Sequence, residues 1–137
     1  MTAAVPGFRF EVADGVGTVV LDRPDKLNAL TFGVYDGLVR LFAEVGGNEG
    51  VRSIVIRGQG RAFCSGGDVN EIIGKLLGRS AEERLAFTRT TCALVRNIRL
   101  CPQPVIASLH GAVAGAGAVI ALAADLRVAA ASSKISF

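Results

Sequence analysis

The sequence has too few metal-binding and disulfide-forming side chains to build either kind of site. It contains one histidine, His110, and three cysteines, Cys64, Cys92 and Cys101. No two cysteines form a C-x-x-C pair, and one histidine cannot complete a zinc site at ligand spacing. An odd number of such cysteines is typical of a reducing compartment, so we expect a cytoplasmic protein that binds no metal.

The sequence also lacks the marks of nucleic-acid-binding, membrane and secreted proteins. Its 15 Lys and Arg residues are scattered singly among acidic residues, so we expect no nucleic-acid partner despite a formal net charge of +3. Its longest apolar run without a charge, residues 111–124, is shorter than the roughly 20 residues that cross a bilayer. Residues 1–7 contain neither a basic nor an apolar signal region. We therefore expect no membrane association and no secretion.

Strand and helix patterns alternate along the chain. Apolar alternation on either side of Asp14-Gly15 predicts a hairpin over residues 8–22. Ser80 and Glu83 form a capping box that opens a predicted helix ending near Leu100, and Asp68 with Glu71 predicts a second helix start. Other predicted elements are helices over residues 31–45 and 117–124 and strands over residues 53–57, 105–109 and 126–129. Half of the residues are hydrophobic, so this order predicts one α/β domain without an internal boundary.

Two glycine-rich segments stand where a strand gives way to a helix. They are GQGRAFCSGGD at residues 58–68 and HGAVAGAGAVI at residues 110–120. Backbone N–H groups in two such turns, each followed by the positive end of a helix, could converge on one oxyanion. Tight packing alone is the alternative explanation for either segment.

Two nucleotide-binding motifs are excluded in these segments. A dinucleotide fingerprint starting at Gly115 needs glycine or alanine at position 120, which is isoleucine here, and no acidic residue follows at the required distance. The phosphate loop G-x-x-x-x-G-K-[ST] does not occur in the sequence.

Three ordered blocks resemble the crotonase superfamily, that is, the enoyl-CoA hydratase/isomerase family. The blocks are LDRPDKLNAL at residues 21–30, RAFCSGGD at 61–68 and GAVAGAG at 111–117. The resemblance implies a crotonase-like spiral of ββα repeats. It also implies an acyl-CoA thioester as the substrate partner, with no cofactor beyond that coenzyme A. A role in fatty acid metabolism, homotrimeric or hexameric assembly, and a usual length about twice that of residues 1–137 follow from the same resemblance.

The resemblance also assigns roles to individual residues. The family's two oxyanion N–H donors fall on Ser65 and Ala116. Contacts with the adenine end of coenzyme A fall on Lys26, Leu27 and Ala29. The path of the pantetheine arm falls on Ala62, Gly66, Asp68 and Val69. The acyl pocket falls on Val113, Gly115 and Val119. For Asp68, the role of helix N-cap is favoured over contact with the ligand.

Two positions depart from the family's pattern. Ala116 stands where glycine is usual, and Val119 stands where the family's hydratases carry a catalytic glutamate. Valine cannot activate water or deliver a proton, so the hydration mechanism with two glutamates is not expected. The family's second carboxylate would lie beyond Phe137. An acyl-CoA-binding or assembly subunit without catalytic activity is therefore the alternative to an enzyme that stabilises a thioester enolate.

Three further alternatives concern single residues. A serine peptidase of the same spiral fold would need a serine on the second turn, and residues 111–121 contain none. His110 lies at the end of a predicted strand, where the family often has asparagine, and is expected to be structural rather than catalytic. Cys64 is also expected to be structural, because no histidine that could act as its base lies near it in the sequence. Cys92 and Cys101 are expected in the core. Because the sequence ends at Phe137 within a strand-like segment, we expect it to be part of a longer protein.

Overall fold

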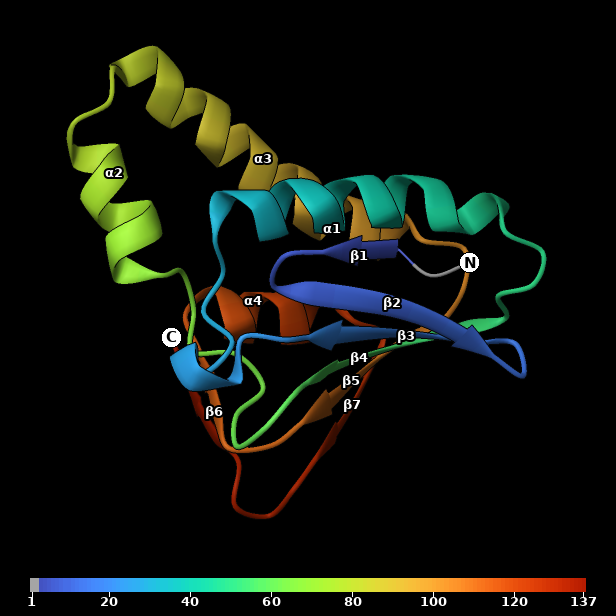
Figure 1. Cartoon of the computed structure of the whole chain (residues 1–137). Coiled ribbons are helices and arrows are strands. Elements are labelled where there is room, and N and C mark those ends of the chain that lie inside the picture. The colour runs from blue at the N-terminus through green and yellow to red at the C-terminus, as the bar shows by residue number, and fades with distance from the viewer. Residues whose placement is uncertain (1–2) are drawn as a thin grey trace.

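The computed structural model describes residues 3–137, which form one mixed and one parallel β-sheet with helices packed around them (Figure 1). The larger sheet has the spatial order β1-β2-β3-β4-β5-β7. Its strands are β1 (Ala3–Val5), β2 (Phe8–Ala13), β3 (Val16–Leu21), β4 (Ser53–Gly58), β5 (Val105–Leu109) and β7 (Leu126–Ala129). Pairing is antiparallel from β1 to β3 and parallel from β3 to β7. The smaller sheet pairs β6 (Ala112–Ala114) with β8 (Lys134–Ser136) in parallel.

The helices lie between the strands in sequence. They are α1 (Phe32–Glu44), α2 (Gly74–Leu77), α3 (Ala81–Leu100) and α4 (Ala116–Ala123), with short turns η1 (Pro24–Lys26), η2 (Val45–Gly47) and η3 (Val69–Ile73). Helix α1 lies across β1 to β3 and contacts α3, and α3 contacts α4 (Figure 1). Helix α2 and the first turns of α3 project away from the sheet (Figure 1).

Most of the expected elements are confirmed. The hairpin of β2 and β3 turns at Asp14 and Gly15, both with positive φ, and the predicted strands over 53–57, 105–109 and 126–129 are β4, β5 and β7. The capping box of α3 has both of its hydrogen bonds, between Ser80 and Glu83. The apolar stripe of α1 is buried against the sheet, because Val34 and Leu38 are fully covered. The expected mixed α/β fold is therefore correct.

Three local features differ from the expectation. The segment after Asp68 opens with a π-helical turn, and Asp68 caps it alone: its carboxylate accepts from the Asn70 and Glu71 amides, while its own N–H donates to the Leu30 carbonyl. Glu71 instead pairs with Lys75. Strand β6 was not predicted, the strand-like segment at the end of the sequence is confirmed as β8, and α4 begins one residue earlier than expected, at Ala116.

Within the described residues, no helix combines the length and apolar character needed to cross a membrane. No group of three or more His, Cys, Asp or Glu side chains in residues 3–137 is arranged to hold a metal ion.

Candidate functional site

The first glycine-rich segment is fixed by hydrogen bonds to the second one. The Phe63 amide donates to the His110 carbonyl at 2.8 Å, and the Cys64 amide donates to the Ala112 carbonyl at 3.1 Å. The Ala114 amide returns a bond to the Cys64 carbonyl at 3.0 Å. These bonds form a parallel bridge between Cys64 and Val113, so the two segments predicted from sequence lie next to each other.

Glycine at the start of α4 permits a close approach between the two segments. A Cβ atom on Gly117 would lie 2.3 Å from the Cys64 carbonyl oxygen, which no side chain tolerates. Gly66 has a φ of +113°, and a Cβ atom built on it would lie 3.7 Å from the Ala116 nitrogen. The turn at residues 64–67 therefore faces the N-terminus of α4 at van der Waals distance.

The Ser65 amide is not available as an oxyanion donor. It donates to the Leu27 carbonyl at 3.0 Å, so the expected pairing of Ser65 with Ala116 requires correction. In the described part of the chain, the amides of Gly67 and Ala116 have no hydrogen-bond partner. Gly115, the N-cap of α4, makes no side-chain cap, which leaves this helix terminus open.

Backbone alternation indicates the direction of the Gly67 amide. Leu30 donates to the Gly66 carbonyl and accepts from the Asp68 amide, which places Leu30 opposite Gly67 in a parallel bridge. In that pairing the N–H of the bridged residue itself points away from its partner strand. The Gly67 amide thus points away from Leu30, and the preceding Gly66 lies beside Gly115 and Ala116 at the start of α4.

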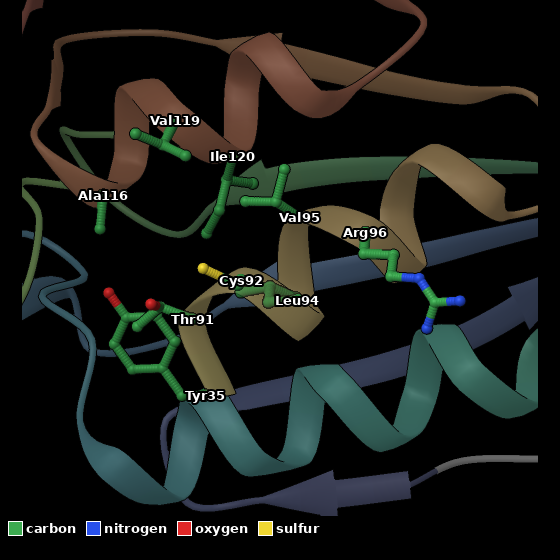
Figure 2. A pocket seen from close by; sticks show the side chains of 9 residues that line it. All are labelled: Tyr35, Thr91, Cys92, Leu94, Val95, Arg96, Ala116, Val119 and Ile120. Carbon is green, nitrogen blue, oxygen red and sulfur yellow. The ribbon is translucent and has the colours of Figure 1, made fainter. Parts of the chain in front are cut away.

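An apolar pocket of about 480 Å³ adjoins this place. Its lining comes from α1, α3 and α4 (Figure 2) and consists of Tyr35, Thr91, Cys92, Leu94, Val95, Arg96, Ala116, Val119 and Ile120. The lining contains no carboxylate. Of the three residues expected in the acyl pocket, Val119 lines it and is 43% exposed, whereas Val113 is fully buried in β6. Gly115 is exposed at the turn and does not line this pocket. The burial of Val113 makes it a structural position, whereas contact of Gly115 with an acyl group stays a prediction.

The residues expected near the adenine end lie in and after η1. Lys26 is exposed, while Leu27 is half-buried with a positive φ. The Leu27 carbonyl accepts from Ser65, and the buried Ala29 carbonyl accepts from Arg23 at 2.6 Å. The main-chain carbonyls of Leu27 and Ala29 are therefore already engaged, which leaves the Lys26 ammonium as the free polar group of the three.

Asp68 and Arg23 hold this segment against the first glycine-rich turn. The Arg23 guanidinium lies 3.2 Å from the Asp68 carboxylate, which is itself almost buried. Hydrogen bonds from the Glu71 amide first, then from Arg23 and Asn70, lower the pKa of Asp68 against the opposing effect of burial. Every contact of Asp68 is internal, which supports the favoured role as helix N-cap.

Asn28 was not recognised as a structural residue from the sequence. It is buried, its side-chain oxygen accepts from the Arg23 amide at 2.8 Å, and its side-chain nitrogen donates to the carbonyls of Gln59 and Ala62. It therefore ties the η1 segment to the loop before Ser65. Its place within the block at residues 21–30 was the available signal.

The remaining expected path residues differ in exposure. Ala62 is buried, and its carbonyl accepts from Asn28. Gly66 is buried beside Gly115, whereas Val69 is 69% exposed on η3. Contact of Ala62, Gly66 and Val69 with a pantetheine arm stays a prediction.

The cysteines and the histidine do not form a nucleophilic site. Cys64 is buried, and burial raises the pKa of its thiol to about 11, so it stays protonated at neutral pH. The His110 ring bonds the Gly60 carbonyl at 2.7 Å, as a structural residue would. The expectation that Cys92 lies in the core was wrong, because Cys92 is exposed at the pocket, whereas Cys101 is partly buried and packs against the core.

Comparison with known proteins gives one consistent answer. Residues 11–137 match the profile of the enoyl-CoA hydratase/isomerase family. The chain is 38% identical to a probable enoyl-CoA hydratase of Rhodobacter capsulatus, over 91% of this chain and 46% of that protein. It is 34% identical to the 1,2-epoxyphenylacetyl-CoA isomerase of Escherichia coli, over 90% of this chain and 47% of that protein.

Solved structures agree with the sequence comparison. A Streptomyces coelicolor protein assigned as an enoyl-CoA hydratase superposes with a TM-score of 0.91 at 54% identity, over 97% of this chain and 50% of that chain. An enoyl-CoA hydratase/carnithine racemase of Magnetospirillum magneticum gives 0.88 at 30% identity, over 98% and 49%. The chain spans about half the length of the relatives it matches.

Proposed function

The chain belongs to the enoyl-CoA hydratase/isomerase family, and we propose that it binds an acyl-CoA thioester whose carbonyl oxygen accepts hydrogen bonds from the Gly67 and Ala116 amides. The observation that carries this proposal is that two amides without a partner among residues 3–137 belong to turns in contact with each other, one of which lines an apolar pocket. Gly67 takes the role of first oxyanion donor, which the family resemblance had assigned to Ser65. Ala116 keeps its expected role.

The two amides would stabilise the charge that develops when a base from solvent removes a proton from the carbon next to the carbonyl, since the pocket lining supplies no carboxylate to take it. That step moves negative charge onto the thioester oxygen and forms an enolate. Fixed N–H donors favour the charged oxygen over the neutral one, and the positive end of α4 adds to the effect. The acyl group would occupy the pocket between α1, α3 and α4, which excludes water from one side of the reacting carbons.

Coenzyme A enters as part of the substrate, and the proposal needs no other cofactor. The exposed ammonium of Lys26 would meet a phosphate of the nucleotide. The pantetheine arm would run past Gly66 and Val69, between Lys26 and the hole. Asp68 would act indirectly, by holding Arg23 and the N-terminus of η3 in place.

Hydration by a pair of glutamates is not part of the proposal. Val119 lies in the first turn of α4 and lines the pocket, and none of the residues that line the pocket is a carboxylate. We favour isomerisation or a related reaction at the carbons next to the thioester. The same observation supports a second candidate function, an acyl-CoA-binding subunit that performs no chemistry. Homotrimeric or hexameric assembly belongs to both candidates.

Proton exchange separates the candidates. The chain is incubated with butyryl-CoA in heavy water, and deuterium entering the carbon next to the carbonyl is followed by mass spectrometry while calorimetry measures binding. Binding with exchange faster than in buffer supports the enzyme. Binding without exchange supports the silent subunit, and absence of binding contradicts both.

A further inference from the structure

Tyr35 places a hydroxyl group in a largely apolar pocket, whose lining also includes the polar residues Thr91 and Arg96. It is the only tyrosine of the chain and lies on α1, with 6% of its surface exposed. Its hydroxyl has no hydrogen-bond partner among the described residues, yet it is not sealed from the pocket it lines. Figure 2 shows the hydroxyl end of the ring directed into the pocket, toward the wall where Ala116 stands. Nothing in the proposed enolate chemistry uses this group.

The ring that carries the hydroxyl is held in one orientation. The edge of Phe87, on α3, packs against it with centroids 5.3 Å apart and planes at 90°. Phe87 is held in turn by Phe32, at 5.0 Å and 82°. Because the aromatic contacts fix the ring, the hydroxyl stays at one place in the pocket, as a recognition group requires.

The hydroxyl is a hydrogen-bond donor at every physiological pH. Burial, and to a smaller extent the nearby Cys64, raise the pKa of Tyr35 to about 12. The neighbouring Thr91 hydroxyl donates to the Thr88 carbonyl at 2.8 Å and so does not compete as a donor. The facing wall of Leu94, Val95, Val119 and Ile120 offers no acceptor side chain. A hydrocarbon acyl chain in this pocket would displace water from the hydroxyl and leave it unpaired, which is unfavourable.

We propose that Tyr35 is a specificity-determining residue that donates a hydrogen bond to an oxygen atom of the acyl group. The pocket would then prefer acyl-CoA thioesters that carry a hydroxyl or keto oxygen over plain hydrocarbon thioesters of the same length. This inference rests on the proposed binding of acyl-CoA. It goes beyond that proposal by naming the chemical class of the acyl group and the residue that selects it.

Matched thioesters test the inference. Binding of butyryl-CoA, 3-hydroxybutyryl-CoA and 4-hydroxybutyryl-CoA is measured by calorimetry with the wild-type chain and with Tyr35→Phe, which removes the hydroxyl and keeps the ring. We expect the wild type to bind at least one hydroxy derivative about 10- to 100-fold more tightly than butyryl-CoA. Tyr35→Phe should lose that preference and bind butyryl-CoA at least as tightly as the wild type does.

A control and a spectroscopic measurement make the result specific. Thr90→Val removes a hydroxyl from α3 outside the pocket and should leave the preference unchanged. The near-ultraviolet absorbance of the single tyrosine should shift when the preferred thioester binds, since a hydrogen bond forms at the phenol; a structural residue would show no shift. Thermal unfolding confirms that Tyr35→Phe is folded.

Two results would overturn the inference, and they are distinguishable. If the wild type binds all three thioesters equally, Tyr35 selects nothing, although the proposed acyl-CoA binding stands. If the wild type binds none of them, the proposed function itself fails and the inference fails with it.

Discussion

Position 116 offers a direct test of the oxyanion donors, because a single backbone N–H can be removed there with little other change. Ala116 is the first residue of α4, where proline is tolerated in helices because that N–H makes no helical bond. Ala116→Pro should therefore fold, and it should lower the rate of deuterium exchange into butyryl-CoA by roughly 100- to 1000-fold.

Two controls accompany Ala116→Pro. Ala81→Pro makes the same change at the first residue of α3, away from the site, and should exchange at the wild-type rate. Ser65→Ala removes a hydroxyl whose backbone amide is already bonded to Leu27, and it should be nearly silent. A large loss in Ser65→Ala would show that the hydroxyl itself contacts the thioester.

Tyr35 also makes stability depend on alkaline pH. Below pH 10 the phenol is protonated in both the folded and the unfolded chain; between pH 10 and about 12 the unfolded chain loses the proton while the folded chain keeps it. Stability should therefore fall as the pH rises through this window, by about 3 kcal/mol in total. The tyrosinate absorbance of the folded chain, which has one tyrosine and no tryptophan, measures the folded pKa directly.

The difference between the wild type and Tyr35→Phe isolates this effect. Lysine and cysteine side chains also titrate in the same range, but they do so in both proteins. Denaturant unfolding of each protein at several alkaline pH values gives the comparison. Parallel loss of stability in wild type and variant, or a tyrosinate transition near pH 10, would contradict the buried position of the hydroxyl.

At single residues, the sequence identified the right turns but not the right atoms. The block at residues 61–68 located a donor turn, yet the choice between Ser65 and Gly67 depends on which amide is taken by Leu27, a contact over a long stretch of chain. Asn28 stands within the recognised block at residues 21–30, but its role, like that of Tyr35, depends on contacts between distant parts of the chain. A buried asparagine and a pocket tyrosine acquire their roles only from side chains that tertiary folding brings to them.

At the scale of elements, the contact between α4 and the Cys64 turn sets the geometry of the hole. Gly117→Ala would place a methyl group 2.3 Å from the Cys64 carbonyl oxygen, so α4 must move away. We expect a loss of about 1 to 3 kcal/mol in stability, together with slower deuterium exchange because the two amides separate. Denaturant unfolding and the exchange assay measure the two effects.

Gly33→Ala is the matched control for this change. Gly33 is the second residue of α1, as Gly117 is of α4, but a Cβ atom there meets only the Thr31 hydroxyl at 3.9 Å. It should keep or slightly raise stability. Equal behaviour of the two variants would mean that the approach of α4 is not limited by this glycine.

Elements with strong local patterns were predicted well, and those made by pairing were not. The β2–β3 hairpin and the Ser80–Glu83 capping box depend on neighbouring residues and were found at their expected places. Strand β6, which was not predicted, has three residues and exists because it pairs with the distant segment β8. The π-helical turn of η3 was likewise outside what helical periodicity and an N-cap can specify.

Over the whole molecule, apolar side chains that remain exposed gather late in the sequence. The apolar face of α1 is buried against the sheet, and α3 exposes Leu85 and Leu100 while burying Leu94 and Ile98. The further exposed large residues are Val69, Ile73, Leu77, Val119, Leu122, Leu126, Val128, Ile135 and Phe137.

Strand β7 combines exposed apolar residues with an open sheet edge. It is the last strand of the six-stranded sheet, and Leu126 and Val128 on it are 60% and 64% exposed. An uncovered edge with apolar side chains favours pairing with another chain. We therefore expect the 137-residue chain to self-associate, with a sedimentation coefficient that rises with concentration.

Charge on that edge should reduce the association. Val128→Lys places a lysine on β7, where edge strands commonly carry one, and should shift the sedimentation profile toward the monomer because like charges on two paired edges repel. Arg52→Ser, on an exposed loop before β4, alters charge away from that edge and is the control. If apolar contacts hold the wild-type assembly together, added salt should not dissociate it, whereas an assembly held by surface ion pairs would weaken in salt. A wild-type chain that sediments as a monomer at all accessible concentrations would show that the β7 edge does not pair with another chain. The expected self-association through this edge would then be wrong.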